Sequence, residues 1–253
     1  MARTPKLAAG TLGVAAAVYA AYVAAAWLRY GNTAPATGDA ADRMLDRFMP
    51  RYDIVERHHI EVAAPADVTL DAACDQDMMS LPVAKTIFKA RELILGSEPD
   101  TGAHPRGLLA MTQSIGWGEL ARTPGREIVM GAVTQPWKAD VVFRPLPPDQ
   151  FAAFNEPGYV KIVWTLRADP IGRNGSVFRT ETRAVATDAY ARAKFRRYWS
   201  LLSPGIILIR RAMLLPLKAE AERRAAALPR PAVYEARRNV PAAVFSRSSN
   251  SAR

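Results

Sequence analysis

The stretch VFRTETRAVATDAYARAKFRRYWSLLSPGIILIRRAMLLPL (residues 177–217) joins a strand pattern to a long helix pattern, and this combination decides the fold. In its first nine residues Phe178, Thr180 and Thr182 alternate with charged side chains, which predicts a β-strand over residues 177–185. Asp188 follows as a preferred helix N-cap, and beyond it apolar residues recur at helical spacing. The sequence therefore predicts a strand followed directly by one long C-terminal helix.

The predicted C-terminal helix has an apolar stripe and two interruptions. The stripe consists of Phe195, Tyr198, Trp199, Leu202, Ile206, Ile209, Met213 and Leu217. Four arginines lie off this stripe, namely Arg196, Arg197, Arg210 and Arg211. Pro204-Gly205 predicts a break or kink in the middle of the helix, and Pro216 predicts a second bend.

The region before this stretch is predicted to be rich in strands. The predicted strands are Tyr52–Val62, Gly116–Arg122, Glu127–Gln135, Lys138–Arg144 and Tyr159–Arg167. Asn174-Gly175 is a strong hairpin signal, and helices are expected at residues 66–79 and 83–95. This order of elements indicates an α+β protein in which a curved antiparallel sheet wraps around the long C-terminal helix. Such a sheet leaves a cavity wherever interior side chains do not fill it.

The N-terminus contains an uncharged apolar run, residues 7–28, which is ~33 Å long as a helix and long enough to cross a ~30 Å hydrocarbon core. We expect a single-pass membrane anchor. Two alternatives remain open: a cleaved signal peptide, with small-residue cleavage sites at 24–26 or 34–36, and an ordinary soluble helix. Charges flank the run on both sides, so the side of the membrane that holds the domain stays undecided, with a lean toward an N-terminus in the cytoplasm.

Composition divides the chain into four expected parts. Residues 1–30 form the anchor, 31–50 a linker with a short helix at its end, 51–228 the folded domain, and 229–253 a disordered basic tail.

The net charge of +10 lies entirely in residues 188–253, which hold 14 basic and 4 acidic residues. A basic segment of this kind favours an anionic membrane surface, and we expect no nucleic-acid partner.

Several reaction classes find no support in the sequence. The single cysteine, Cys74, cannot form an internal disulfide, and the acidic residues beside it disfavour a reactive thiolate. His58 and His59 are neighbours on a strand and point to opposite faces, so they cannot readily share a metal ion. There is no nucleophile elbow, no Walker A loop and no dinucleotide fingerprint, and we expect no metal and no cofactor.

Five residues are the candidate ligand-binding site. Glu56 and His58 share the largely apolar face of the first strand, where a carboxylate and an imidazole could bind a polar head group or exchange protons. Thr180 and Thr182 share a face with Phe178 and could offer hydroxyl groups, and Trp164 is a candidate for the cavity wall. For each of them a purely structural role is the alternative.

Several stretches resemble the START-like superfamily, also called SRPBCC, which has the helix-grip fold and includes polyketide cyclases and lipid-transport proteins. The resemblance lies in residues 52–57 and 62–67, in Glu156–Trp164, in Thr180–Asp188 and in Phe195–Trp199, and it covers residues 50–228. It implies a ligand cavity but no catalytic motif. Membrane-anchored members with one N-terminal span have the same layout.

These observations lead to one expected function and two alternatives. We expect a membrane-anchored, non-enzymatic domain that binds a hydrophobic or amphipathic molecule, either a lipid or an isoprenoid-like compound. The first alternative is a cyclase or dehydratase that uses Glu56 and His58 as an acid–base pair. The second is a basic module that docks on a membrane surface or a protein partner.

Overall fold

The computed structural model describes residues 4–96, 102 and 105–228. Its strands are β1 (Ile54–Val62), β2 (Gly118–Thr123), β3 (Glu127–Thr134), β4 (Val160–Ile171) and β5 (Gly175–Ala186). Its α-helices are α1 (Thr4–Arg29), α2 (Arg43–Phe48), α3 (Ala66–Asp75), α4 (Pro82–Leu95), α5 (Leu108–Ser114), α6 (Pro148–Ala153) and α7 (Ala189–Ala227). Two short 3-10 helices, Gly38–Ala40 and Met78–Ser80, complete the described elements.

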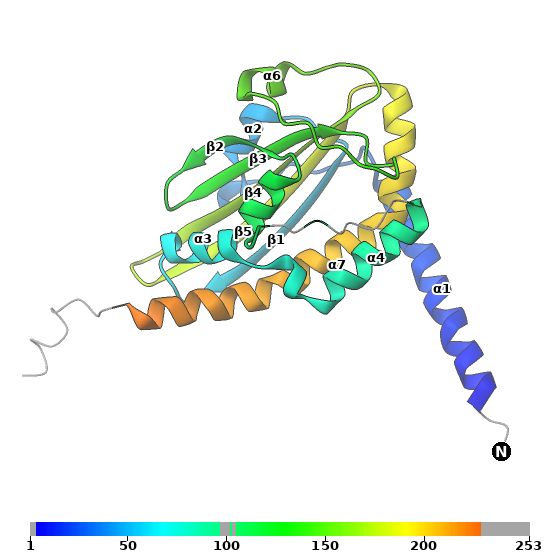
Figure 1. The fold of residues 1–253 in the computed structure, drawn as a ribbon, viewed down its shortest axis with the longest axis horizontal. Coiled ribbons are helices and arrows are strands. Elements are labelled where there is room, and N and C mark those ends of the chain that lie inside the picture. The colour runs from blue at the N-terminus through cyan, green and yellow to red at the C-terminus, as the bar shows by residue number, and fades with distance from the viewer. Residues whose placement is uncertain (1–3, 97–101, 103–104, 229–253) are drawn as a thin grey trace, which may run out of the picture.

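The five strands form one antiparallel sheet in the order β1-β5-β4-β3-β2, with α7 running along it (Figure 1). The hairpin expected at Asn174-Gly175 joins β4 to β5, with the turn at residues 172–174. Asp188 caps α7 as expected, since its side chain accepts a hydrogen bond from the Ala191 amide. The α+β prediction is confirmed, and the arrangement fits the helix-grip fold.

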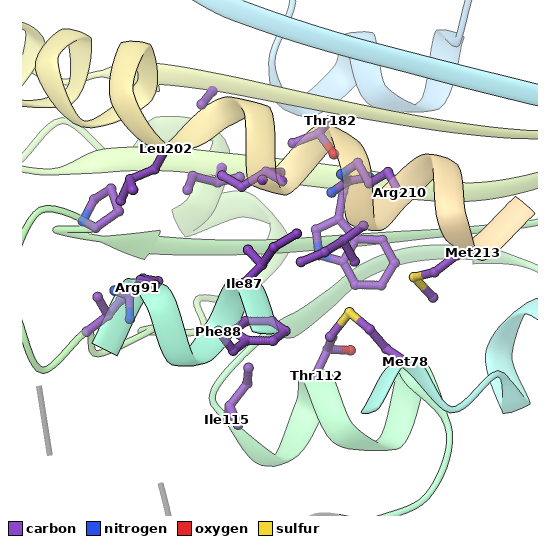
Figure 2. Close-up of a pocket in the computed structure, with 18 of the residues that line it drawn as sticks. Met78, Ile87, Phe88, Arg91, Thr112, Ile115, Thr182, Leu202, Arg210 and Met213 are labelled. Atoms are coloured by element: carbon purple, nitrogen blue, oxygen red, sulfur yellow. The ribbon is translucent and has the colours of Figure 1, made fainter. Parts of the chain in front are cut away.

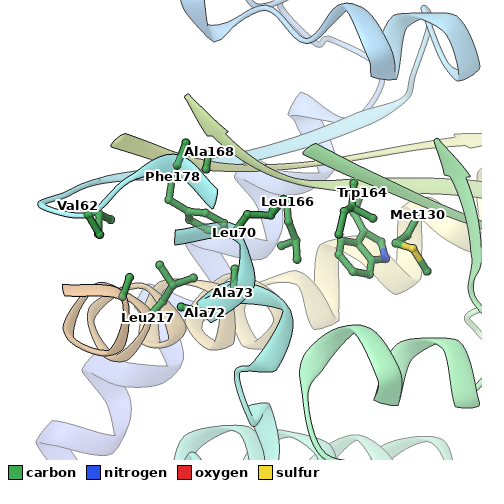
Figure 3. Packing of buried hydrophobic residues seen from close by; sticks show 14 residues of the cluster. Val62, Leu70, Ala72, Ala73, Met130, Trp164, Leu166, Ala168, Phe178 and Leu217 are labelled. Atoms are coloured by element: carbon green, nitrogen blue, oxygen red, sulfur yellow. The ribbon is translucent and has the colours of Figure 1, made fainter. Parts of the chain in front are cut away.

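The inner face of the sheet, which we define as the face covered by α3 and α7, holds the largest apolar cluster. Trp164, Leu166 and Phe178 from the sheet meet Leu70 from α3 and Leu217 from α7 (Figure 3). These side chains alternate along the strands with polar ones, so a single strand contributes to both faces. The C-terminal half of α7 is held against the sheet by this cluster.

Helix α7 is continuous through both prolines, and Figure 1 shows that it changes direction partway along. Pro204 cannot donate to the carbonyl four residues before it, so a bend without a break is the expected response. Gly205 has a second role, because a Cβ atom there would lie 2.8 Å from Ile87 of α4. The absent side chain lets α4 pack closely against α7.

The outer face, which we define as the opposite face of the sheet, is covered by α2 and α6. Leu45 and Met49, which belong to the segment expected as a linker, are buried against Val129, Val163 and other outer-face residues. The short helix expected at the end of that segment is α2, and its N-cap is Asp42. Residues 31–50 therefore pack on the sheet along part of their length.

One predicted strand is absent, and two short helices were not predicted. The predicted strand at Lys138–Arg144 is a loop, which contacts β3 through a bridge between Val133 and Arg144 and a hydrogen bond from the Thr134 hydroxyl to the Val142 carbonyl. Prolines 145, 147 and 148 follow directly and lack the amide hydrogens that would extend the ladder. The region also contains α5 and α6, two helices of one to two turns that were too short to show a clear hydrophobic period.

The apolar N-terminal run is helical, as α1, but its C-terminal part is attached to α7. The Tyr19 hydroxyl donates to the Leu201 carbonyl at 2.6 Å, and Tyr22 shares a hydrogen bond with Ser203. Residues 4–18, which precede these contacts, extend only ~22 Å, less than the ~30 Å of a hydrocarbon core.

By length and composition, the helix that could cross a membrane is a different one from the helix expected to do so. Within the part of the chain that the structure describes, the one helix long and apolar enough to cross a membrane is α7, and α1 contributes only the shorter apolar stretch Ala16–Arg29. One face of α7 packs on the sheet, as the core helix of a soluble domain also would. The expected span at residues 7–28 is thus not the helix that meets both the length and the composition of a membrane span. The tail expected at 229–253 lies outside the described residues.

Candidate functional site

A cavity of about 790 Å³ lies between the inner face of the sheet, α7, α4 and α5. Its size falls in the range of about 300–1,000 Å³ that is typical of small-molecule sites. Apolar side chains dominate its wall: Phe88 and Ile87 from α4, Ile162 and Trp164 from β4, and Ile209 from α7. Figure 2 shows α4 and α7 on opposite sides of this space.

Three of the five predicted site residues line the cavity: Trp164, Thr180 and Thr182. The register of the sheet explains why they share it, because Trp164 of β4 lies opposite Thr182 of β5, and directly paired residues project from the same face. Thr180 lies two residues before Thr182 on β5 and projects from the same face. The pairing of β4 with β5 therefore brings the three side chains to one wall of the cavity.

Glu56 and His58 lie on the same face but are not among the described residues of the cavity wall. On β1 they pair with Thr182 and Thr180 respectively, which places them one strand further out. The His58 Nε2 and Glu56 Oε2 atoms are 4.0 Å apart, beyond hydrogen-bond length. The acid–base pair expected for an enzyme is thus close together but not joined.

Burial favours the neutral forms of both side chains, whereas the nearby arginine charges act on the two in different ways. Burial raises the pKa of Glu56, while the charges of Arg210, Arg211 and Arg29 oppose that rise. Burial, together with the charges of Arg210 and Arg211, lowers the pKa of His58 to about 4. His58 is therefore uncharged at neutral pH, and its buried Nε2 atom has no hydrogen-bond partner among the described residues.

Arg210 is the wall residue that the sequence reasoning missed. It reaches from α7 into the cavity, and its Nη1 atom donates to the Thr180 hydroxyl at 3.3 Å (Figure 2). The signal was present in the helical spacing, since Arg210 follows Ile206 by four residues and precedes Met213 by three, which places all three on one side of α7. The stripe predicted for this helix leaves Arg210 out, because it consists of apolar residues alone.

The cavity wall contains three further charged residues. They are Arg91 and Glu92 on α4 and the exposed Asp140 in the loop after β3. Figure 2 shows Arg91 well separated from Arg210. Arg210 is thus the charged wall residue beside the two threonines.

The described residues contain no cluster of three or more metal-binding side chains. Burial is the main cause that raises the pKa of the Cys74 thiol to about 11, with the acidic residues Asp71 and Asp75 adding to it. A thiol with so high a pKa is a poor nucleophile at neutral pH. The site therefore offers an apolar cavity with a few polar groups.

No protein-family model matches the chain, and no curated protein sequence matches it. Solved structures with some likeness include CalU16 from Micromonospora echinospora, which is 16% identical over 69% of this chain and 87% of that one, with a TM-score of 0.25. Norcoclaurine synthase from Thalictrum flavum is 14% identical over 66% and 94%, with a TM-score of 0.29. The Zhui aromatase/cyclase from a Streptomyces species is 14% identical over 69% and 96%, with a TM-score of 0.23. At these TM-scores, nothing about the ligand or reaction of this chain follows from the matches.

Proposed function

We propose that this chain is a START-like domain that binds a hydrophobic or amphipathic small molecule, such as a lipid or an isoprenoid-like compound, without catalysis. The observation that carries the proposal is the cavity of about 790 Å³ between the sheet and α7, with its largely apolar wall. Burying the apolar surface of a ligand there contributes roughly 25 cal/mol per Å². Trp164, Thr180 and Thr182 are the proposed contacts, and Glu56 and His58 flank them.

We further propose that the cavity exchanges its ligand with a membrane. Tyr19, Ile94 and Leu201 are exposed apolar residues that also belong to the cavity wall. They come from α1, α4 and α7, so an apolar rim surrounds one end of the cavity beside the proposed anchor helix. An apolar rim of this kind is covered favourably by a bilayer.

Native mass spectrometry of the full-length chain, released from lipid nanodiscs prepared without detergent, tests the binding function. The expected result is a bound species of a few hundred daltons. Ala90→Trp, at the exposed edge of the cavity wall on α4, is expected to reduce its occupancy by filling the space. Lys89→Trp is the matched control, because Lys89 is exposed on the same helix but outside the wall.

Two results contradict the binding function: an apo mass that persists after incubation with apolar compounds, or equal occupancy in the two tryptophan variants. Flotation with lipid vesicles tests the membrane contact separately. The double variant Ile94→Glu/Leu201→Glu is expected to float less than the wild type. Ile171→Glu, which changes an exposed residue at the distant β4–β5 hairpin, is expected to float normally.

A further inference from the structure

Arg210 is a cation with very few protein partners. A guanidinium has five N–H donors, and the one hydrogen bond of its side chain to described residues goes to the Thr180 hydroxyl at 3.3 Å. No described carboxylate lies within 4.0 Å of it. The nearest acid with an electrostatic effect on it is Glu56, on β1. Most of its donors are therefore available to a ligand in the cavity.

Arg210 remains charged despite this environment. Burial lowers the pKa of Arg210 to about 10, with Glu56 acting in the opposite direction, so the guanidinium is protonated at neutral pH. His58 nearby is neutral, and the neighbouring Arg211 is exposed and lies outside the cavity wall. The Arg210 guanidinium thus gives this part of the cavity a positive charge, which favours an anion, and Glu56 is the nearby acid that acts against it.

Two hydroxyl groups accompany the cation. Thr180 and Thr182 are two residues apart on the same face of β5, and both line the cavity. The Thr182 hydroxyl is buried and has no hydrogen-bond partner among the described residues. A buried polar group without a partner is costly, so a ligand that bonds to it gains affinity. Figure 2 shows Arg210 extending from α7 toward the strand that carries Thr182.

We propose that the ligand is an amphiphile with an anionic oxygen head group, a carboxylate or a phosphate monoester, bound by Arg210 together with the hydroxyl groups of Thr180 and Thr182. The apolar body of the ligand then lies against Trp164 and Phe88. This inference rests on the proposed function, because it names the class of ligand for the same cavity. An arginine and hydroxyl donors match both head groups, since each presents oxygens that accept several hydrogen bonds.

Three probes with the same brominated chain test the proposal: 12-bromododecanoate, 12-bromododecyl phosphate and 12-bromododecan-1-ol. Bromine quenches tryptophan fluorescence at short range, and Trp117, Trp164 and Trp199 line the cavity. The measurement is quenching of the full-length chain as each probe is added at neutral pH. We expect at least one anionic probe to bind about tenfold or more tightly than the alcohol, and the two anions to reveal which head group is preferred.

Variants of the neighbouring residues Arg210 and Arg211 test which of the two causes the preference for anions. Arg210→Met is expected to bind the anions and the alcohol about equally, and Arg210→Lys to retain part of the preference. Arg211→Met is the matched control, because Arg211 is exposed and lies outside the wall, and it should keep the wild-type preference. Far-UV circular dichroism checks that each variant folds. If Arg210→Met does not fold, Arg210→Lys and Thr182→Val decide the question.

The outcomes separate this inference from the proposed function. Quenching of the wild type by all three probes with equal affinity overturns the anionic head group and leaves apolar binding intact. A full anion preference in folded Arg210→Met also overturns it, whatever Arg211→Met shows. Absence of quenching by every probe overturns the proposed function itself.

Discussion

Two arginines on opposite sides of the sheet extend into the protein, Arg183 from β5 on the outer face and Arg210 from α7 toward the inner face, and they differ in their partners. Arg183, on the outer face, is 2% exposed and donates to Glu181 at 2.7 Å, to Asp46 at 2.6 Å and to the Met49 carbonyl at 2.9 Å. Its guanidinium also stacks over Tyr52. Arg210, on the inner face, has a single long hydrogen bond to a hydroxyl group.

The difference in partners between Arg183 and Arg210 indicates a structural role for the first and a ligand-binding role for the second. Burial opposes the charge of Arg183, but the hydrogen bonds and charges of Glu181 and Asp46 outweigh it and raise its pKa. For Arg210 burial prevails and lowers the pKa. The charge of Arg183, bonded to two carboxylates and a carbonyl, fixes the segment around Asp46 and Met49 on the sheet. A charge with few partners is free to select a ligand.

The largest expected effect comes from exchanging each arginine for methionine. Arg183→Met leaves Glu181 and the Met49 carbonyl buried with fewer partners, so the free energy of unfolding should fall by about 3–5 kcal/mol. Arg210→Met should leave it within about 1 kcal/mol of the wild type or raise it. Urea denaturation measures both. Equal losses in the two variants would show that Arg210 is structural and would remove the contrast.

The next effect concerns pH and the outer face. Burial, together with a hydrogen bond and the charge of Asp42, raises the pKa of Glu127 to about 8 from its ordinary 4.5. The folded state therefore holds a proton that the unfolded state loses, and stability should decline as the pH rises from about 4.5 to 8, by an amount on the order of a few kcal/mol. Glu127→Gln should flatten this dependence in denaturation experiments across that range. A dependence that is unchanged in the variant would contradict the assignment.

The inner face should respond to pH in the opposite direction. Because burial lowers the pKa of His58 to about 4, the unfolded chain binds a proton near pH 6.5 before the folded one does. Stability should then fall as the pH drops from about 6.5 to 4, by up to about 3 kcal/mol. His58→Gln should remove this loss in acid denaturation. His59→Gln is the control on the opposite face, where the side chain is exposed, and it should behave as the wild type does.

The smallest expected change in stability concerns two threonines, one on each face of the sheet. The Thr165 hydroxyl on the outer face donates to Glu127 at 3.2 Å, whereas the buried Thr182 hydroxyl on the inner face has no partner among the described residues. Thr165→Val should cost about 1 kcal/mol, and Thr182→Val should cost nothing or stabilise the protein slightly. Thermal unfolding of the two variants side by side checks this. A larger cost at Thr182 would mean that its hydroxyl is bonded in the free protein.

Much of the fold could be predicted because it depends on patterns among neighbouring residues. The alternation around Thr180 and Thr182, the hairpin before β5 and the N-cap at Asp188 each depend on neighbouring residues alone. The prediction that Trp164, Thr180 and Thr182 would face the ligand space follows from the same alternation, and all three line the cavity. That they contact a ligand stays a prediction.

The two errors have different origins, one in neighbouring residues and one in long-range contacts. Lys138–Arg144 has a strand-like composition, but the prolines after it stop it from joining the sheet. The apolar run at residues 7–28 satisfies the length of a membrane span, whereas in the structure its later part is bonded to α7 through Tyr19 and Tyr22. The partners Leu201 and Ser203 are 182 and 181 residues away in the chain and could not be identified from adjacent residues, whereas the prolines could.

The sequence by itself determined the α+β class, the strand–helix order and the inward faces of the strands, because period and capping are properties of consecutive residues. Only the tertiary structure decided which charges have partners. Arg183 and Arg210 look alike in the sequence, and their difference comes from Asp46 and Glu181 on one face and a hydroxyl-lined cavity on the other. Charge compensation depends on residues brought together across the fold, since Coulomb and hydrogen-bond energies depend on distance in space.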